Sequence, residues 1–228
     1  MPFPGAGADF AAQRADMVER QLRRRGIMDE RVLEAMATVP RERFVPEPYV
    51  RRSYADSALP IGHDQTISQP WIVAAICQAL ELHGDERVLE IGTGSGYSAC
   101  VLALLAREVL TIERVSELAA QARETIRDLG FAEIEVLVGD GSVGAPDRAP
   151  FDAVAVHATA PEPPAALIRQ LVVGGRVVVP IASRSADLLT VFRRTAERVD
   201  TATRDGLQRE VIGPCRFVPL IGSEGYAE

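Results

Sequence analysis

Lysine is absent from this sequence of 228 residues, and all 25 of its basic residues are arginine. Acidic residues outnumber them at 32, so the net charge is −7 and the isoelectric point is about 5.2. A chain of that overall sign is a poor general binder of polyphosphates, although a local basic patch is compatible with it. We therefore expect no nucleic-acid partner, and we give the preference for arginine itself no functional weight.

Cysteine is scarce, and long apolar runs are missing. The three cysteines, Cys77, Cys100 and Cys215, are widely spaced in apolar surroundings. This pattern predicts free thiols in a reducing compartment, with no disulfide framework and no metal site. The N-terminus lacks the basic region and apolar run of a signal peptide, and no stretch reaches the ~18 apolar residues of a membrane span. We expect a cytoplasmic monomer that binds no membrane.

Several catalytic signatures are also absent: a Ser-His-Asp order, a CxxC pair, HExxH, and a GKS or GKT phosphate loop. A site without a general base or a metal suits a reaction whose nucleophile is already ionised. A carboxylate attacking a cationic sulfonium methyl is such a reaction, because a carboxyl with a free pKa near ~4 needs no proton removed at neutral pH. Orientation and desolvation would then supply most of the rate.

The sequence that is present divides into segments of different pattern. We expect residues 1–10 to be disordered and residues 11–228 to form a single domain. Within it, residues 11–84 form a helical extension that covers the substrate and cofactor, residues 85–182 an α/β core, and residues 183–228 the C-terminal strands. In the extension we expect three helices, with a stop at Gly26 and a cap at Asp29; they cover residues 11–25, 30–37 and 70–82.

The core alternates between two kinds of element. Near-continuous Val, Ile and Leu runs separated by helices indicate a parallel sheet with helices on both faces. The strands are expected at 87–92, 108–113, 134–140, 151–157 and 176–182, and the helices at 98–106, 116–130 and 163–172. Three further runs, "DLLTVFRR", "LQREVIG" and "CRFVPLIG", predict antiparallel strands at the sheet edge. The fold class is therefore α/β, a doubly wound, mostly parallel sheet of the seven-stranded type.

Ligands of such sheets bind beyond the carboxyl ends of the strands. At the first of these ends lies "EIGTGSGY", in which Gly92, Thr93, Gly94, Ser95 and Gly96 form a loop able to approach a ligand closely. Its G-x-G-x-G spacing departs from the dinucleotide pattern G-x-G-x-x-G. The acidic residue just before this loop, Glu90, could meet an ammonium group. The alternative is a tight strand-to-helix turn without a ligand.

The next two strand ends also carry carboxylates. Glu113 follows Gly92 by 21 residues, a spacing suited to accepting both hydroxyls of a ribose; the alternative is a surface glutamate that pairs with Arg114. Asp140 and Gly141 follow the third strand and could accept from the exocyclic amine of adenine. The alternative there is an ordinary turn, since Asp-Gly is a strong turn dipeptide.

Two polar segments remain as substrate candidates. The stretch "LPIGHDQTISQP", residues 59–70, holds Thr66, Ile67 and Ser68, and it is either the wall of an active site or a loop whose serine caps the next helix. His157 opens the proline-rich "HATAPEPP" after the fourth strand, a composition that suits a substrate rim. We do not expect this lone histidine to act as a base.

Together these residues resemble the protein-L-isoaspartate O-methyltransferase family, a group of class I S-adenosylmethionine-dependent methyltransferases. The resemblance runs from about residue 17 to residue 220. "VLEIGTGSGY" is common to many methyltransferases, whereas "LPIGHDQTISQP", "GDGSVG…APFDAV", "P..LIRQLVVGGRVVVPI" and the closing "RFVPL" are sharper signals. Trp71 and His157 depart from what we expect of this family.

The resemblance implies a cofactor, a reaction and a set of roles. S-adenosyl-L-methionine would lie against the glycine loop with its ribose on Glu113 and its adenine near Asp140 and Gly141. Thr66, Ile67 and Ser68 would face the reacting carboxyl, with Ser68 as the active residue. The implied reaction methylates the free α-carboxylate of isoaspartyl residues in damaged proteins and peptides, and the ester then collapses to a succinimide.

Other functions compete with this interpretation. A related carboxyl methyltransferase could act on a dedicated peptide or small molecule, such as a natural-product precursor. A cofactor-binding regulator without activity is disfavoured by the intact glycine loop and Ser68. A nicotinamide dehydrogenase is disfavoured by the glycine spacing and by the lack of a paired acid and base.

Overall fold

The computed structural model describes residues 8–227 of the chain. Its α-helices are α1 (Ala8–Asp16), α2 (Glu30–Thr38), α3 (Pro70–Leu80), α4 (Tyr97–Ala103), α5 (Ser116–Asp128) and α6 (Ala165–Arg169). Its strands are β1 (Leu59–Gly62), β2 (Gln65–Ile67), β3 (Arg87–Ile91), β4 (Glu108–Glu113), β5 (Glu135–Val138), β6 (Phe151–Val156), β7 (Leu171–Ile181), β8 (Asp187–Arg194) and β9 (Leu207–Cys215). Within the described chain, no helix is long and apolar enough to cross a membrane.

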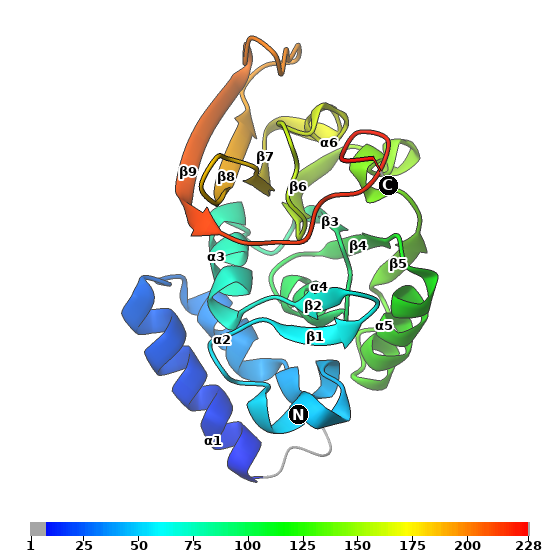
Figure 1. Ribbon diagram of the computed structural model, residues 1–228. Coiled ribbons are helices and arrows are strands. Elements are labelled where there is room, and N and C mark those ends of the chain that lie inside the picture. The colour runs from blue at the N-terminus through cyan, green and yellow to red at the C-terminus, as the bar shows by residue number, and fades with distance from the viewer. Residues whose placement is uncertain (1–7, 228) are drawn as a thin grey trace.

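Seven of these strands form one sheet, in the order β5-β4-β3-β6-β7-β8-β9. The five from β5 to β7 are parallel, and β8 and β9 are antiparallel to their neighbours. The predicted fold class is therefore confirmed (Figure 1). The chain proceeds from β3 to one edge and then returns to place β6 on the other side of β3. The order thus reverses between β3 and β6, where open α/β sheets bind their ligands.

The sheet is covered on both faces because alternate side chains of each strand point to opposite sides. In β3, Val88 belongs to a core that also contains α3, α4 and α5, whereas Leu89 belongs to a second core with α6. All of these strand positions are nearly inaccessible to solvent. A strand buried on both faces is therefore mostly apolar along its whole length, which is the pattern that the sequence shows; in β3, Glu90 is the buried exception.

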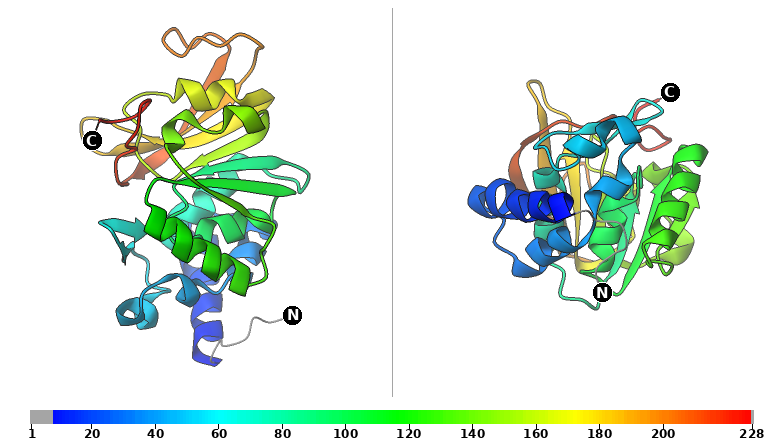
Figure 2. Two further views of the ribbon diagram at one scale, coloured as in Figure 1. Left: turned by 90° about the vertical axis from the view of Figure 1, so that its right-hand side faces the viewer. Right: turned by 90° about the horizontal axis from the view of Figure 1, so that it is seen from below.

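The first part of the N-terminal extension, up to residue 38, packs against α3 and α4 at the end of the molecule opposite the β8–β9 ribbon (Figures 1 and 2). Asp29 caps α2 as predicted, since its carboxylate accepts from the backbone N–H groups of Arg31 and Val32. Gly26, at φ 91°, ends the first helical segment, which is not a uniform α-helix: α1 passes into a π-helical turn (Met17–Leu22) and a 3₁₀ turn (Arg23–Arg25). The expected disorder of residues 8–10 is wrong, because they belong to α1. Residues 1–7 lie outside the described chain.

Three segments differ from the predictions in the kind of element that they form. Residues 59–67 form a β-hairpin, β1–β2, with residues His63 and Asp64 at positive φ in its turn. The helix expected over 163–172 ends at Arg169, and β7 begins at Leu171. The reason is that Leu171 pairs with Phe151 of β6 and so belongs to the sheet. The run "CRFVPLIG" adds no strand after Cys215. It crosses the sheet end as an irregular segment with isolated bridges instead.

The cysteines are free thiols, as predicted. Cys77 and Cys100 are buried, and burial raises the pKa of both. Cys215 is only half-buried, because it lies at the end of the edge strand β9. Burial raises its pKa to about 12.

Candidate active site

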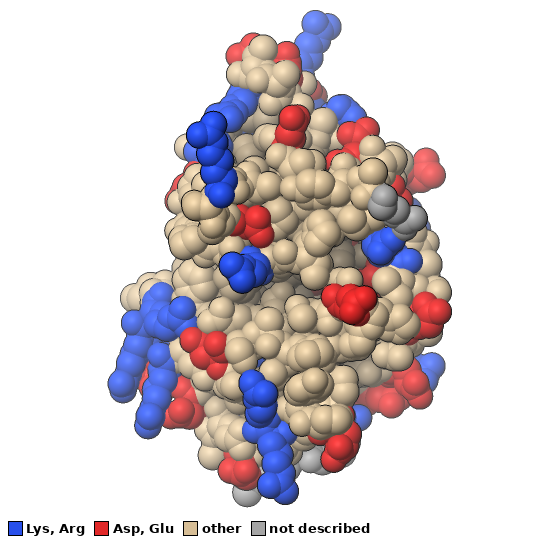
Figure 3. Space-filling model, viewed as in Figure 1, with Lys and Arg blue, Asp and Glu red and all other residues tan. Residues whose placement is uncertain are grey.

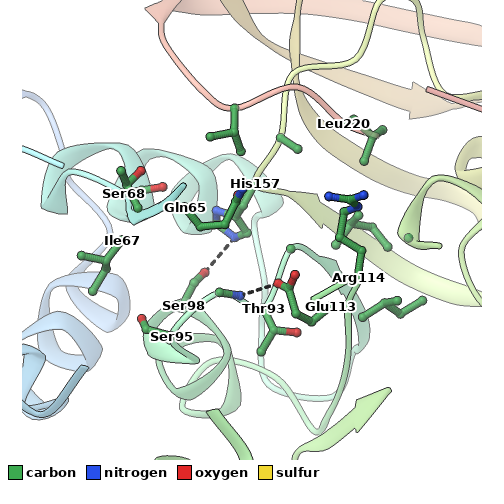
Figure 4. Close-up of a pocket in the computed structure, with 18 of the residues that line it drawn as sticks. Gln65, Ile67, Ser68, Thr93, Ser95, Ser98, Glu113, Arg114, His157 and Leu220 are labelled. Carbon is green, nitrogen blue, oxygen red and sulfur yellow. Dashed lines mark hydrogen bonds between the residues drawn. The ribbon is translucent and has the colours of Figure 1, made fainter. Parts of the chain in front are cut away.

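A cavity opens at the carboxyl ends of β3, β4 and β6, beside the β1–β2 hairpin (Figure 4). It brings together segments separated by more than 150 residues. The lining residues are Gln65, Thr66, Ile67, Ser68, Val73, Ile91, Gly92, Thr93, Gly94, Ser95, Tyr97, Ser98, Ile112, Glu113, Arg114, Gly141, His157, Ala158, Val218, Pro219, Leu220 and Ile221. Most of the predicted cofactor and substrate positions therefore meet in one place.

The glycine loop and Glu113 form one wall. Glu113 ends β4 and is only 5% exposed, so the alternative of a surface glutamate is wrong. One carboxylate oxygen accepts from the N–H of Gly94 at 2.9 Å and the other from the N–H of Val115 at 3.0 Å. Each oxygen keeps a further lone pair, so the carboxylate can still accept two hydroxyl groups.

Gly96 explains why the loop turns so sharply. It lies at φ 88° and is the N-cap of α4. A Cβ there would come within 2.9 Å of the Ile126 side chain on α5. Glycine is needed both for the left-handed backbone and for this close approach between helices.

Glu90 lies behind the cavity wall and does not line the cavity. Its carboxylate is fully buried; one oxygen accepts from the Thr111 hydroxyl at 2.6 Å, and the other lies 3.3 Å from Nε2 of His157. The same His157 nitrogen lies 2.9 Å from the hydroxyl oxygen of Ser98. The structure therefore favours a role for Glu90 in holding His157 rather than in direct contact with an ammonium group.

His157 lines the cavity and does not complete a catalytic triad with Ser98 and Glu90. In such a triad the two ring nitrogens face different partners, whereas both partners here face Nε2. The ring also lies near Phe217, with centroids 6.4 Å apart. Its position between the glycine loop and the C-terminal segment suits the predicted substrate wall.

Asp140 and Gly141 are placed differently from each other. Gly141 lines the cavity, as predicted, but the Asp140 carboxylate is already engaged. One oxygen accepts from the N–H and hydroxyl of Ser142, and the other accepts from the N–H and hydroxyl of Ser223 at 2.8 and 2.7 Å. These four bonds fill the carboxylate's acceptor sites, so Asp140 fastens the C-terminal segment in this conformation.

The hairpin segment forms the opposite wall. Thr66, Ile67 and Ser68 all line the cavity, and Ile67 is buried with its side chain directed away from His157 (Figure 4). The prediction that Ser68 caps the next helix is wrong. The N-cap of α3 is Gln69, with no side-chain capping bond, because Pro70 and the extended backbone of Gln69 start the helix one residue later.

Arg41 holds this wall in place, a role that the sequence did not suggest. Its guanidinium is fully buried and donates to the carbonyl oxygens of Ser53 and Ser68, both at 2.7 Å. It also lies 4.9 Å from the ring centroid of Tyr97, the residue that follows the glycine loop. Burial lowers the pKa of Arg41 to about 10, so it remains charged at neutral pH.

The sequence analysis also missed further lining residues, which reach the cavity when the chain folds. They are Gln65, Ser98, Arg114, Leu220 and Ile221. The motif "RFVPL" was a signal for Leu220, but nothing in the sequence indicated that it crosses to the carboxyl end of β6. There, the N–H of Leu220 donates to the carbonyl of Thr159 at 2.8 Å.

Comparisons with known proteins agree with this site. A model of the protein-L-isoaspartate(D-aspartate) O-methyltransferase family matches residues 12–225. A protein-L-isoaspartate O-methyltransferase of Koribacter versatilis is 51% identical over 218 residues, which cover 96% of this chain and 95% of that protein. One from Rhodopseudomonas palustris is 50% identical, over 99% of this chain and 90% of that protein.

Solved structures show the same fold. A protein-L-isoaspartate O-methyltransferase superimposes with a TM-score of 0.81 and 27% identity, over 93% of this chain and 67% of that one. A putative family member from Plasmodium falciparum, in complex with S-adenosyl-L-homocysteine, superimposes with a TM-score of 0.74 and 24% identity, over 91% of this chain and 98% of that one. The matched residues include both walls of the cavity, and the chain belongs to the protein-L-isoaspartate(D-aspartate) O-methyltransferase family.

Proposed function

We propose that this chain transfers a methyl group from S-adenosyl-L-methionine to the free α-carboxylate of L-isoaspartyl residues in damaged proteins and peptides. The observation that carries the proposal is the meeting of the Glu113 and glycine-loop wall with the Ser68 wall in one cavity. The relatives at about half identity carry this activity in their names. A dedicated natural-product substrate has no comparable support.

The residues of the cavity fit this cofactor. Glu113 has lone pairs left for the ribose hydroxyls, and Gly92 and Gly94, which have no side chain, together with the small Ser95 leave room for the amino-acid part. Gly141 marks the adenine end. When bound, S-adenosyl-L-methionine supplies an electrophilic sulfonium methyl.

The chain's own task is to place the acceptor. Ser68 and Thr66 orient the acceptor carboxylate, Arg41 fixes the backbone of Ser68 from behind, and His157 closes the cavity between the two subsites. No residue has to remove a proton, because the acceptor carboxyl is ionised at neutral pH. Orientation of the two reactants within one cavity then provides the acceleration.

The product is a methyl ester of the isoaspartyl residue. Its methoxy group is a better leaving group than the original carboxylate oxygen, so the following backbone nitrogen can close a succinimide. Hydrolysis of that ring returns part of the chain to a normal aspartyl bond.

We propose in addition that the protein acts as a cytoplasmic monomer on proteins and peptides, without nucleic acid or membrane. A single chain supplies the whole cavity, with residues from each of the three expected segments, so a single domain suffices for the chemistry. The free cysteines suit a reducing compartment.

The decisive experiment is transfer of labelled methyl to matched isoaspartyl and aspartyl peptides. The isoaspartyl peptide should gain a base-labile methyl ester, and the aspartyl control should not. Equal labelling of the two, or labelling of neither, would contradict the proposal.

A further inference from the structure

A second hollow adjoins the active-site cavity on the side of Trp71. Thr66, Ser68, His157 and Val218 line both the cavity and the hollow, so the two are continuous. Figure 3 shows this face of the molecule, with basic and acidic side chains around its hollowed centre. An acceptor residue in the cavity is part of a polypeptide, so the residues before and after it must extend out of the cavity through an opening of this kind.

Trp71 forms a fixed wall of the hollow. Its Nε1–H donates to the carbonyl of Arg25 at 3.2 Å, and the Arg25 guanidinium lies 5.3 Å from its ring centroid. Asp56 lies 2.7 Å from that guanidinium and also accepts from the Gln69 side chain. Trp71 therefore offers an aromatic face to the hollow, and the positive charge of the neighbouring Arg25 is already paired with Asp56.

Arg216, in the segment that follows β9, also lines the hollow and is exposed. The backbone around it is fastened: the N–H of Phe217 donates to Asp187 at 3.2 Å, and the carbonyl of Val218 accepts from Thr159 at 2.8 Å. Among the described residues, none forms a hydrogen bond or an ion pair with the Arg216 side chain. The mouth of the site thus carries one uncompensated positive charge on a well-anchored segment.

We propose that this hollow binds the stretch of acceptor polypeptide next to the isoaspartyl residue, and that Arg216 pairs with a carboxylate on that stretch. The inference rests on the proposed function and adds a sequence preference to it. Phe217 and Trp71 provide apolar contact for an extended chain, and the charge at Arg216 selects its side chains. Because the protein as a whole is negative at −7, a local cation also helps to receive acidic acceptors that the remaining surface repels.

The test is a charge-reversal cycle. Isoaspartyl peptides carry a single Glu, Gln or Lys two residues before or two residues after the isoaspartyl residue, and each is assayed with the wild type and with Arg216→Glu. Arg209→Glu is the matched control, since Arg209 is exposed on β9 and does not line the hollow. It makes the same change in net charge.

The wild type should prefer Glu over Lys in kcat/KM on one side of the isoaspartyl residue, and Arg216→Glu should reverse that preference. Partly exposed pairs have modest strength, so the Glu-to-Lys ratio should change by roughly 2- to 20-fold, mainly through KM. The change should shrink at high salt. Arg209→Glu should leave the ratio unchanged, and affinity for S-adenosylhomocysteine should be the same in all three proteins.

Two failures are distinguishable. If the wild type methylates none of the isoaspartyl peptides, including the Gln series, the proposed function itself is wrong. If it methylates them, but the Glu-to-Lys ratio is the same in the wild type and Arg216→Glu on both sides, only the assignment of Arg216 and the hollow is overturned. An equal shift in Arg209→Glu would likewise overturn it, since the effect would then come from net charge alone.

Discussion

The two walls of the cavity are built from different parts of the fold. The wall that we propose holds the cofactor, called the cofactor wall below, consists of strand ends and the loop after β3, and its carboxylate, Glu113, is fixed by the N–H groups of Gly94 and Val115. The wall that we propose receives the acceptor, called the acceptor wall below, consists of the β1–β2 hairpin and the C-terminal segment, neither of which belongs to the main sheet. It is fastened by single side chains, above all Arg41 and Asp140.

This difference in construction predicts where the site is sensitive to substitution. Many backbone hydrogen bonds hold the strands of a parallel sheet together, so the loss of one has little effect. The acceptor wall is held by the few hydrogen bonds of single side chains, and one substitution can remove all the bonds of such a side chain. We therefore expect substitutions at the fastenings to disturb the acceptor wall and to leave the cofactor wall able to bind.

Arg41→Leu should produce the largest effect on stability. The carbonyls of Ser53 and Ser68 would lose a charged donor in a buried site, while the burial cost that lowers the pKa of Arg41 would be relieved. We expect a net loss of about 2–4 kcal/mol in the free energy of unfolding. Urea denaturation measures it, and exposed Arg52→Leu should lie within ~0.5 kcal/mol of wild type. Equal stability of the two variants would show that the acceptor wall does not depend on Arg41.

Ser68→Asp tests the acceptor wall through its effect on the rate of methyl transfer. With capping excluded, the new carboxylate should act only by repelling the acceptor carboxylate at close range. We expect kcat/KM to fall by at least ~100-fold, with the melting temperature and S-adenosylhomocysteine affinity close to wild type. Ser68→Asn, of similar size and without charge, should lose much less activity. If the Asp and Asn variants turn over equally, Ser68 does not face the acceptor.

Glu113→Ala should weaken cofactor binding without changing the acceptor wall. The loss of a charged acceptor should weaken S-adenosylhomocysteine binding by roughly 10- to 100-fold in calorimetric titration. Glu108→Ala is the control, because Glu108 lies at the other end of β4 and pairs with Arg87 on the surface. Unchanged affinity in Glu113→Ala would remove the ribose assignment.

The smallest effect concerns the fastening of the C-terminal segment by Asp140. Burial by itself raises the pKa of this carboxyl, but the bonds from Ser142 and Ser223 outweigh it and lower the pKa to about 2. A lowered carboxyl pKa stabilises the fastened segment fully above the ordinary value of 3.8, and this contribution is lost as the pH falls through about 2. Amide exchange at Ser223, corrected for its intrinsic rate, should therefore stay slow from pH 7 to about 4.

Asp140→Asn should speed that exchange by roughly tenfold already at neutral pH, because an amide nitrogen would replace one acceptor oxygen. Asp200→Asn is the control, since Asp200 accepts two N–H bonds in a distant surface turn. Equal exchange at Ser223 in the wild type and Asp140→Asn would show that this carboxylate does not fasten the segment.

The position of the cofactor wall follows from patterns that are local in the sequence. Continuous apolar runs specify strands buried on both faces, and parallel strands must place their carboxyl ends at one edge, so the glycine loop and Glu113 had to meet there. The spacing of 21 residues between Gly92 and Glu113 is one βα unit, a local quantity that the sequence displays directly.

The acceptor wall depends on tertiary contacts, because its hydrogen bonds join residues that no local pattern relates. Arg41 reaches Ser68 across 27 positions, and Ser223 reaches Asp140 across 83. The burial of Glu90 beside His157 is of the same kind: periodicity indicates that a residue is inside, but not which polar group it meets there. The direction of a charged side chain in the core depends on every element packed around it, and that packing exists only once the chain has folded.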